Sequence, residues 1–262
     1  MSALFPGLAY LICGDARTGS SLLAATLRAT GVAGKPYEYF GAAEIDAPWM
    51  REQLNVPAHE TFTGFPAWRD YILAAGAQGG GVFGASVHWH HADTLRQTFQ
   101  RPGETLTQTL RRVFPRLRLV RLRRRNFVAQ AVSHHVAIVS NIWNSTSAPD
   151  RKPGEIDVGA PYDFAAIDEQ VGNARRGAEG WAQLLAPLND VTLALTYEEL
   201  AADLEGEVRR VLAYVGIARE GVTIRPALQK QAGAWSLALE RRYREERHAR
   251  GLGPVGDEAE FQ

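Results

Sequence analysis

The order of apolar and polar residues along the chain predicts strands that alternate with helices. Residues 8–13 form a continuous apolar run that ends at Gly14, which is typical of a central parallel strand buried on both faces. The next segment, 19–31, is rich in alanine and leucine and ends at Gly31, which predicts a helix with a glycine terminus. This strand, turn and helix form a βα unit at the start of the chain.

The same alternation continues along the rest of the chain. Strand-like segments lie at 82–89, 117–122 and 191–196, and helical sequence separates each from the next. The helical segments are 65–75, 105–114, 126–143, 164–188, 198–215 and 235–250. Strands that alternate with helices favour a parallel sheet covered on both faces. We therefore expect an α/β chain with a three-layer, P-loop-like fold around a central parallel sheet.

One segment interrupts this pattern. Residues 147–162 are rich in proline, glycine and charged side chains, which predicts a long, mobile surface loop. Both a lid over a site and a solvated connector fit this composition. The length of 262 residues is enough for one substantial core, so we expect a single domain over 1–262.

Composition limits the classes of partner. Lysine and arginine total 29, as do aspartate and glutamate, so no global charge draws the chain to nucleic acid or to an anionic membrane. Cys13 is the only cysteine and cannot form an internal disulfide, which favours the cytoplasm. The first residues lack the basic region with which a signal peptide begins, which disfavours a cleavable signal. No stretch approaches the roughly 20 apolar residues that a membrane span needs. We expect a soluble, cytoplasmic protein without a membrane span or a nucleic-acid partner.

The turn after the first strand carries the clearest chemistry. Residues 14–22, GDARTGSSL, open the first helix, so backbone N–H groups, hydroxyl groups and the positive end of the helix dipole meet there. This arrangement predicts a site for phosphate or sulfate, and a plain helix cap made by Thr18 and Ser20 is the alternative. Ser20 stands where the GxxxxGK[ST] nucleotide loop has lysine, which disfavours a kinase. Arg17 can instead neutralise a leaving phosphate without a magnesium bridge.

This turn and the residues after it match a known family. The segments RTGSSLL and LRATGVAGKPYEYF resemble the start of bacterial sulfotransferases of the trehalose 2-sulfotransferase type, which has an Arg-Ser/Thr-Gly-Ser loop, a helix and a GxPxE(F/Y)F segment. Further matching patches are WRDYI (68–72), GVFG (81–84), QAVS (130–133), EGW (179–181), Gln231-Ala232 and Arg242-Tyr243. The resemblance implies a homodimer whose co-substrate is 3′-phosphoadenosine 5′-phosphosulfate (PAPS).

The resemblance also implies roles for single residues. It assigns the 5′-phosphosulfate to the turn, namely Arg17, Thr18, Gly19, Ser20, Ser21 and Leu22, with Arg17 also catalytic. It assigns the role of general base to Glu38. The aromatic neighbours Tyr37, Tyr39 and Phe40 can desolvate this carboxylate and raise its pKa. Without the resemblance, Glu38 has the pattern of an ordinary surface acid.

The strand 117–122 and the helix after it predict a second anion site. Arginines 123–125 cluster at the carboxyl end of the strand, where ligands bind in open α/β sheets. In sulfotransferases generally, an arginine at such a strand end and a serine on the next helix bind the 3′-phosphate, and Arg124 and Ser133 match them. Arg125 is a rival, because the local alignment is ambiguous by one residue. Lys230 matches a basic residue that precedes Gln-Ala in the family, and Gln231 is the Gln of that pair; both are expected to help to bind the cofactor. A solvated basic surface is the other interpretation of the arginines.

Histidines suggest where the acceptor binds. Strand alternation places His88 and His90 on one face, where they would contact the acceptor together with Tyr39, or act as an alternative base. His134 and His135 are expected to be ordinary surface or core residues. No cysteine or second acidic-histidine cluster completes a zinc set, so no metal is expected.

The chain also departs from the trehalose type. Ser86 and His88 stand where that type has lysine and methionine, Leu239 replaces a tryptophan, and 141–143 lack an expected arginine. These changes are compatible with PAPS as the co-substrate, but they argue against trehalose as the acceptor. The sequence thus predicts a PAPS-dependent O-sulfotransferase that acts on a hydroxyl of a small acceptor, a carbohydrate or another metabolite. The alternatives are a small-molecule kinase on a P-loop fold and a non-catalytic nucleotide-binding protein.

Overall fold

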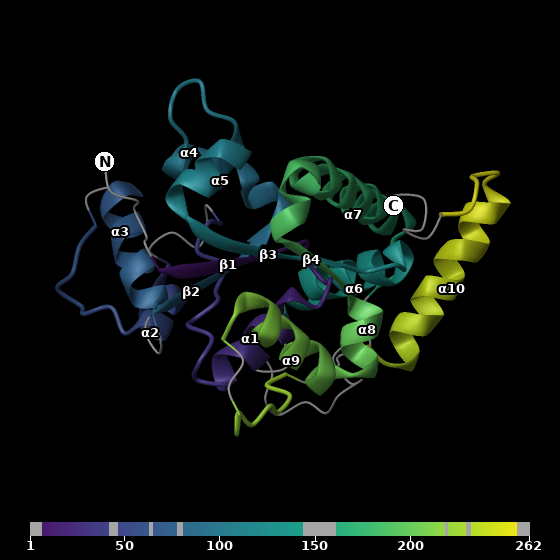
Figure 1. Cartoon of the computed structure of the whole chain (residues 1–262). Helices are drawn as coiled ribbons and strands as arrows, with labels where there is room; N and C mark the ends of the chain where they lie inside the picture. The colour runs from purple at the N-terminus through teal and green to yellow at the C-terminus, as the bar shows by residue number, and fades with distance from the viewer. Residues whose placement is uncertain are drawn as a thin grey trace.

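A four-stranded parallel sheet lies at the centre of the chain (Figure 1). The computed structural model describes residues 7–41, 47–62, 65–77, 81–143, 161–217, 220–228 and 232–255. Its strands are β1 (Leu8–Gly14), β2 (Val82–His88), β3 (Arg116–Arg123) and β4 (Thr192–Thr196), in the order β2-β1-β3-β4. Every pair is parallel, and Cys13 of β1 is level with Val87 of β2 and Arg121 of β3. The carboxyl ends of the strands therefore meet at one edge of the sheet.

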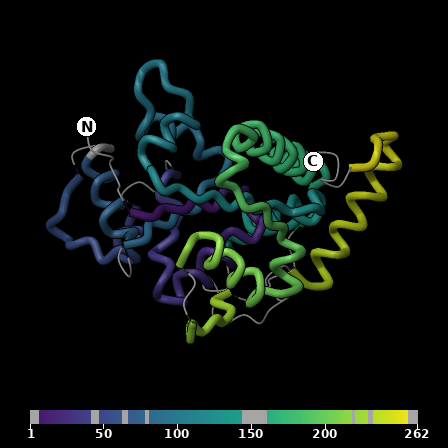
Figure 2. The backbone as a smooth tube through the Cα atoms, viewed as in Figure 1, coloured from purple at the N-terminus to yellow at the C-terminus, as the bar shows by residue number. Residues whose placement is uncertain are grey.

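Helices cover both faces of this sheet, so the predicted three-layer α/β architecture is confirmed (Figures 1 and 2). Side chains of β1 alternate between two cores. Leu11 packs with residues of α3 (Phe65–Gly76), α4 (Ala92–Phe99), α5 (Leu106–Val113) and α7 (Phe164–Leu185). Ile12 packs with residues of α1 (Ser20–Ala29) and α9 (Leu204–Val215) on the opposite face. A third core joins α6 (Phe127–Ser140), α7 and α10 (Ala234–Ala249).

The predicted boundaries hold for most elements and fail in a few places. The segment 198–215 is two helices rather than one, α8 (Tyr197–Ala202) and α9. Asp203 breaks them because its carboxylate accepts a 2.8 Å hydrogen bond from the Gly206 N–H and caps the second helix. The prediction omitted α2 (Pro48–Leu54) and α4, and α7 ends in a 3-10 segment, η3 (Ala186–Val191).

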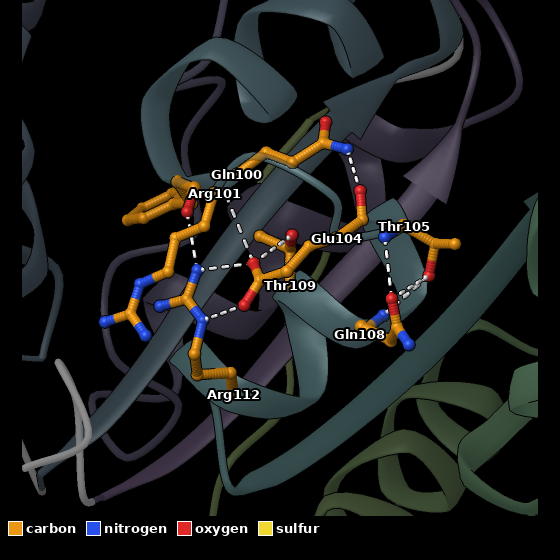
Figure 3. Close-up of polar contacts among 8 residues, drawn as sticks. Gln100, Arg101, Glu104, Thr105, Gln108, Thr109 and Arg112 are labelled. Carbon is orange, nitrogen blue, oxygen red and sulfur yellow. Dashed lines mark hydrogen bonds and ion pairs between the residues drawn. The ribbon is translucent and has the colours of Figure 1, made fainter. Parts of the chain in front are cut away.

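A compact polar network joins α5 to the loop that precedes it (Figure 3). The Glu104 carboxylate accepts hydrogen bonds from the Arg112 guanidinium at 2.7 and 2.8 Å, and from the Thr109 hydroxyl at 2.9 Å. Thr105 and Gln108 form a reciprocal cap that starts α5. The Arg112 hydrogen bond holds the pKa of Glu104 near 2, well below its usual range.

No helix in the described parts of the chain is long and apolar enough to cross a membrane. Residues 147–160 of the predicted loop lie outside the described residues. At the end of that loop, the Tyr162 hydroxyl donates a 2.7 Å hydrogen bond to the Glu246 carboxylate on α10.

Candidate active site

The turn between β1 and α1 forms the floor of the site. Gly19, with φ of 89°, is the N-cap of α1, and no side chain caps the helix. The Thr18 hydroxyl instead donates to the Asp15 carbonyl at 2.7 Å, and the Ser20 hydroxyl lies 3.3 Å from His88 Nε2. The plain-cap alternative is therefore wrong, and the first N–H groups of α1 keep the positive end of the helix dipole available to an anion.

Arg17 connects this turn to the helix after β3. Its backbone has a left-handed φ of 66°, and its Nε donates a 2.9 Å hydrogen bond to the Ser133 hydroxyl on α6. Its guanidinium also donates to the Trp143 carbonyl. Burial, followed by the neighbouring Arg124 charge, lowers the pKa of Arg17 to about 10, so the side chain stays charged at neutral pH. The structure thus brings together Arg17 and Ser133, which are 116 residues apart in sequence.

Arg124 and Arg125 point to different places. The Arg124 guanidinium donates to the Arg17 carbonyl at 3.3 Å and lies 4.5 Å from the centre of the Tyr197 ring. Its Nε is buried with no hydrogen-bond partner among the described residues, and burial lowers its pKa. The Arg125 side chain is 55% exposed and lies 3.7 Å from the Glu199 carboxylate on α8. The Arg125 side chain therefore faces α8, and its backbone N–H also donates to Glu198 on that helix.

Several residues without a predicted role hold the turn in place. Gln130 on α6 donates to the Ala16 carbonyl at 3.0 Å, and the Trp181 indole on α7 donates to the Gly14 carbonyl at 2.8 Å. The Asp15 carboxylate accepts a 3.0 Å bond from the Trp89 N–H, and burial raises its pKa to about 7. A small pocket that is partly open to solvent lies beside the turn, and Asp15, Gln130, Trp181 and the arginines at 121, 123 and 124 line it. Gln130 and Trp181 belong to the QAVS and EGW patches, so the family pattern was a signal that could have found them.

Glu38 lies beside the last residue of β2. Tyr37 bridges to Ala85, and its carbonyl accepts a 2.8 Å hydrogen bond from the Ser86 N–H, which sets the next residue against the strand end. Glu38 Oε1 is then 3.6 Å from His88 Nε2. Burial raises the pKa of Glu38, and the charges of His90 and Arg28 oppose that shift. Burial lowers the pKa of His88 to about 3, so this contact joins a carboxyl group to a neutral imidazole.

Two predicted acceptor residues are placed differently from the expectation. Tyr39 is fully buried, stacks on Phe83 with ring centres 5.8 Å apart, and donates its hydroxyl to the Lys35 carbonyl. It belongs to the core rather than to the site. His90 is not on the strand, because β2 ends at His88 and Trp89–His91 form a 3-10 turn, η1. The centres of the His88 and His90 rings still lie 5.6 Å apart.

The histidines form a cluster at the site. Ring nitrogens of His88, His90 and His91 lie within 4.8 Å of one another, the one grouping in the described residues able to share a metal ion. His91 Nδ1, however, accepts from the His88 N–H at 3.4 Å, and His88 Nε2 faces Ser20, so hydrogen bonds already engage two of the rings. His134, expected to be an ordinary residue, packs edge-on against Trp143. Burial, together with the smaller effect of the Arg17 charge, lowers the pKa of His134 to about 4.

The remaining predicted residues are less informative. Ser21 is exposed on the first turn of α1, and Leu22 packs partly against the α1–α9 core. Lys230 and Gln231 lie outside the described residues. The geometry therefore brings the turn before α1, two arginines, a serine and the partly exposed Glu38 carboxyl group to the carboxyl edge of the sheet.

Comparisons with known proteins show what the chain as a whole is similar to. A family model described as Stf0 sulphotransferase matches residues 9–246. Two curated proteins named trehalose 2-sulfotransferase are similar to the chain, one from Mycolicibacterium smegmatis and one from Mycobacterium tuberculosis. Each is 29% identical over 265 residues, which cover 93% of this chain and 97% of the relative.

Solved structures give more distant similarities. A sulfotransferase from Alicyclobacillus acidocaldarius has a TM-score of 0.47 and 14% identity, covering 94% of this chain and 96% of that chain. The sulfotransferase domain of the Synechococcus PCC 7002 olefin synthase has a TM-score of 0.45 and 13% identity, covering 93% and 89%. A retinol dehydratase in complex with androsterone and inactive cofactor PAP has a TM-score of 0.41 and 16% identity, covering 94% and 66%. The family assignment rests on the family model rather than on these structures.

Proposed function

The chain belongs to the Stf0 sulphotransferase family, and we propose that it transfers the sulfuryl group of PAPS to a hydroxyl of a small acceptor, a carbohydrate or another metabolite. The observation that carries this proposal is the 2.9 Å hydrogen bond from Arg17 to Ser133. Because of this contact, polar groups of the turn after β1 and of α6 lie next to each other. PAPS carries anionic groups at both its 5′ and 3′ positions, so it needs two such groups of donors facing one ligand.

We assign the two ends of PAPS as follows. The turn of Arg17 to Leu22 holds the 5′-phosphosulfate through its N–H groups, hydroxyls and guanidinium. Arg124 and Ser133 hold the 3′-phosphate, and Lys230 and Gln231 are proposed to assist them. Arg124 is favoured over Arg125, because Arg125 faces the α8 glutamates.

The reaction then needs one proton acceptor. As the acceptor oxygen bonds to sulfur, its proton passes to the Glu38 carboxylate, and the bond from sulfur to the 5′-phosphate oxygen breaks. Arg17 and the turn N–H groups stabilise the charge that develops on the leaving phosphate. The products are the sulfated acceptor, adenosine 3′,5′-bisphosphate (PAP) and a proton. We propose that no metal ion takes part, because Arg17 supplies the positive charge at this position.

Other properties of the protein are also proposed. The carbohydrate acceptor is supported by the names of the two curated relatives. A single sulfotransferase domain and a homodimer are supported by the family resemblance, and light scattering tests the dimer. A cytoplasmic location is supported by Cys13, a buried free thiol and the only cysteine.

The direct test is incubation with PAPS and a metabolite extract, followed by mass spectrometry. We expect an acceptor that gains one sulfate group and an equal amount of PAP. Binding of PAP with no turnover across a broad acceptor panel would instead support a non-catalytic nucleotide-binding protein. Magnesium-dependent consumption of ATP would support the kinase.

A further inference from the structure

One nitrogen of the His88 ring faces two groups of the proposed reaction. Its Nε2 is 3.3 Å from the Ser20 hydroxyl of the phosphate turn and 3.6 Å from Glu38 Oε1. The residue is 7% exposed, so water competes little for these contacts. His88 also has a backbone N–H bonded to His91 Nδ1, which keeps the end of β2 and the η1 turn together.

We propose that His88 is a positioning residue whose neutral imidazole donates from Nε2 to the Glu38 carboxylate and aligns it with the phosphate turn. The proposal rests on the proposed role of Glu38 as general base. The 3.6 Å separation is slightly longer than a hydrogen bond, and such contacts commonly tighten when substrates bind. His88 is the polar group that couples the carboxylate to Ser20, because the same nitrogen faces both.

Two observations argue against other roles for this ring. A histidine that relays a proton uses one nitrogen to accept and the other to donate, but Glu38 and Ser20 both face Nε2. A histidine that acts as base must gain a proton near neutral pH, and burial disfavours the charged ring of His88. A neutral N–H donor stabilises the ionised form of Glu38, which is the form that accepts the acceptor proton.

Other charged or titratable groups face His88 and Glu38, and a test of His88 has to leave them unchanged. His90 and the Arg28 guanidinium act on Glu38 through their charges, and Arg28 is held by the Pro36 carbonyl at 2.5 Å and by the Tyr37 ring. His90, His91 and His134 surround His88, from η1 and from α6. All of these groups remain in place in the variants below.

The chain offers matched variants. His88→Met removes the donor and introduces the methionine that the trehalose-type pattern has at this position. His88→Gln keeps an N–H donor near the place of Nε2, whereas the shorter His88→Asn does not reach it. His135→Met is the control, because His135 is 5% exposed and bonds to the Pro161 carbonyl at 2.7 Å, away from Glu38.

The first readout is the pKa of Glu38, followed by NMR of protein labelled with ¹³C in the glutamate carboxyl groups and saturated with PAP. The Glu38 signal is the one missing from Glu38→Gln. We expect His88→Met and His88→Asn to raise this pKa by about one unit, the scale of one lost hydrogen bond. His88→Gln and His135→Met should stay close to the wild type.

The second readout is kcat for sulfuryl transfer against pH. His88→Met should lower kcat by about tenfold and move its acid limb upward, and His88→Gln should restore both. An unchanged Glu38 pKa in His88→Met and His88→Asn would overturn the proposal. Loss of turnover in His88→Gln with an unchanged Glu38 pKa would make His88 the base. If His88→Met does not fold, the Gln and Asn pair carries the same comparison. The NMR readout needs no acceptor, so a wild type that fails to use PAPS refutes the proposed function separately.

Discussion

Replacing Arg124 with alanine tests the proposed 3′-phosphate site. In the structure its guanidinium makes a 3.3 Å hydrogen bond to the Arg17 carbonyl and a 4.5 Å contact with the Tyr197 ring, and its Nε is without a partner among the described residues. A phosphate at this position would gain a charge-assisted hydrogen bond of about 1.5–3 kcal/mol. Because about 1.4 kcal/mol corresponds to a factor of ten, Arg124→Ala should weaken PAP binding about 10- to 150-fold.

The assay is calorimetric titration with PAP and, separately, with 5′-AMP. Wild-type protein should bind PAP far more tightly than AMP or ATP, and Arg124→Ala should hardly change AMP binding, because AMP lacks the 3′-phosphate. Arg125→Ala is the matched control. Its side chain is 55% exposed and faces Glu199, so its loss should change PAP binding by no more than about threefold.

Two results would refute this reasoning. Equal affinity of the wild type for PAP and AMP would remove the second anion site altogether. A larger loss of PAP binding in Arg125→Ala than in Arg124→Ala would mean that the ligand rearranges the β3 end and that Arg125 holds the phosphate. Thermal melts of both variants would show that each remains folded.

The same site and fold can be tested at four further points. Glu38→Gln should lower kcat by a factor of about 10²–10⁴ with little change in PAP affinity. Wild-type kcat should fall at acid pH as Glu38, whose pKa is raised, becomes protonated, and the variant should lose this acid limb. A near-normal kcat in Glu38→Gln would exclude Glu38 as the base. Turnover should survive EDTA, and loss of activity that magnesium restores would favour the kinase. Trehalose should be a poor acceptor because Ser86 and His88 replace lysine and methionine, and efficient trehalose sulfation would show that these positions do not set specificity. The pKa of Glu104 is lowered to about 2, so its contribution to stability should be present above about pH 4 and should disappear as the pH falls toward 2. The difference in melting temperature between the wild type and Glu104→Gln should therefore shrink over this range. A difference that does not shrink would contradict the Arg112 contact.

The sequence by itself determined the architecture and the location of the turn between β1 and α1, to which we assign the phosphosulfate. A buried parallel strand, a glycine turn and the next helix are encoded by residues that are adjacent in the chain, so periodicity reveals them. The family resemblance also required only local segments, and the family model confirmed it over 9–246. Boundaries were missed where one capping side chain decides the outcome, as at Asp203 between α8 and α9.

Tertiary structure decided which side chains face the site. Arg124 and Arg125 are equivalent in a local pattern, but in the structure the Arg125 side chain faces Glu199 on α8, more than 70 residues later. Tyr39 was expected at the acceptor and lies in the core, because Phe83 on β2 offers it a ring to stack on. His88 meets Ser20 and Glu38 because β2 pairs with β1 in a register that sets His88 level with Gly14. Strand and helix periods depend on neighbouring residues, whereas the direction of a side chain depends on what distant segments pack against it.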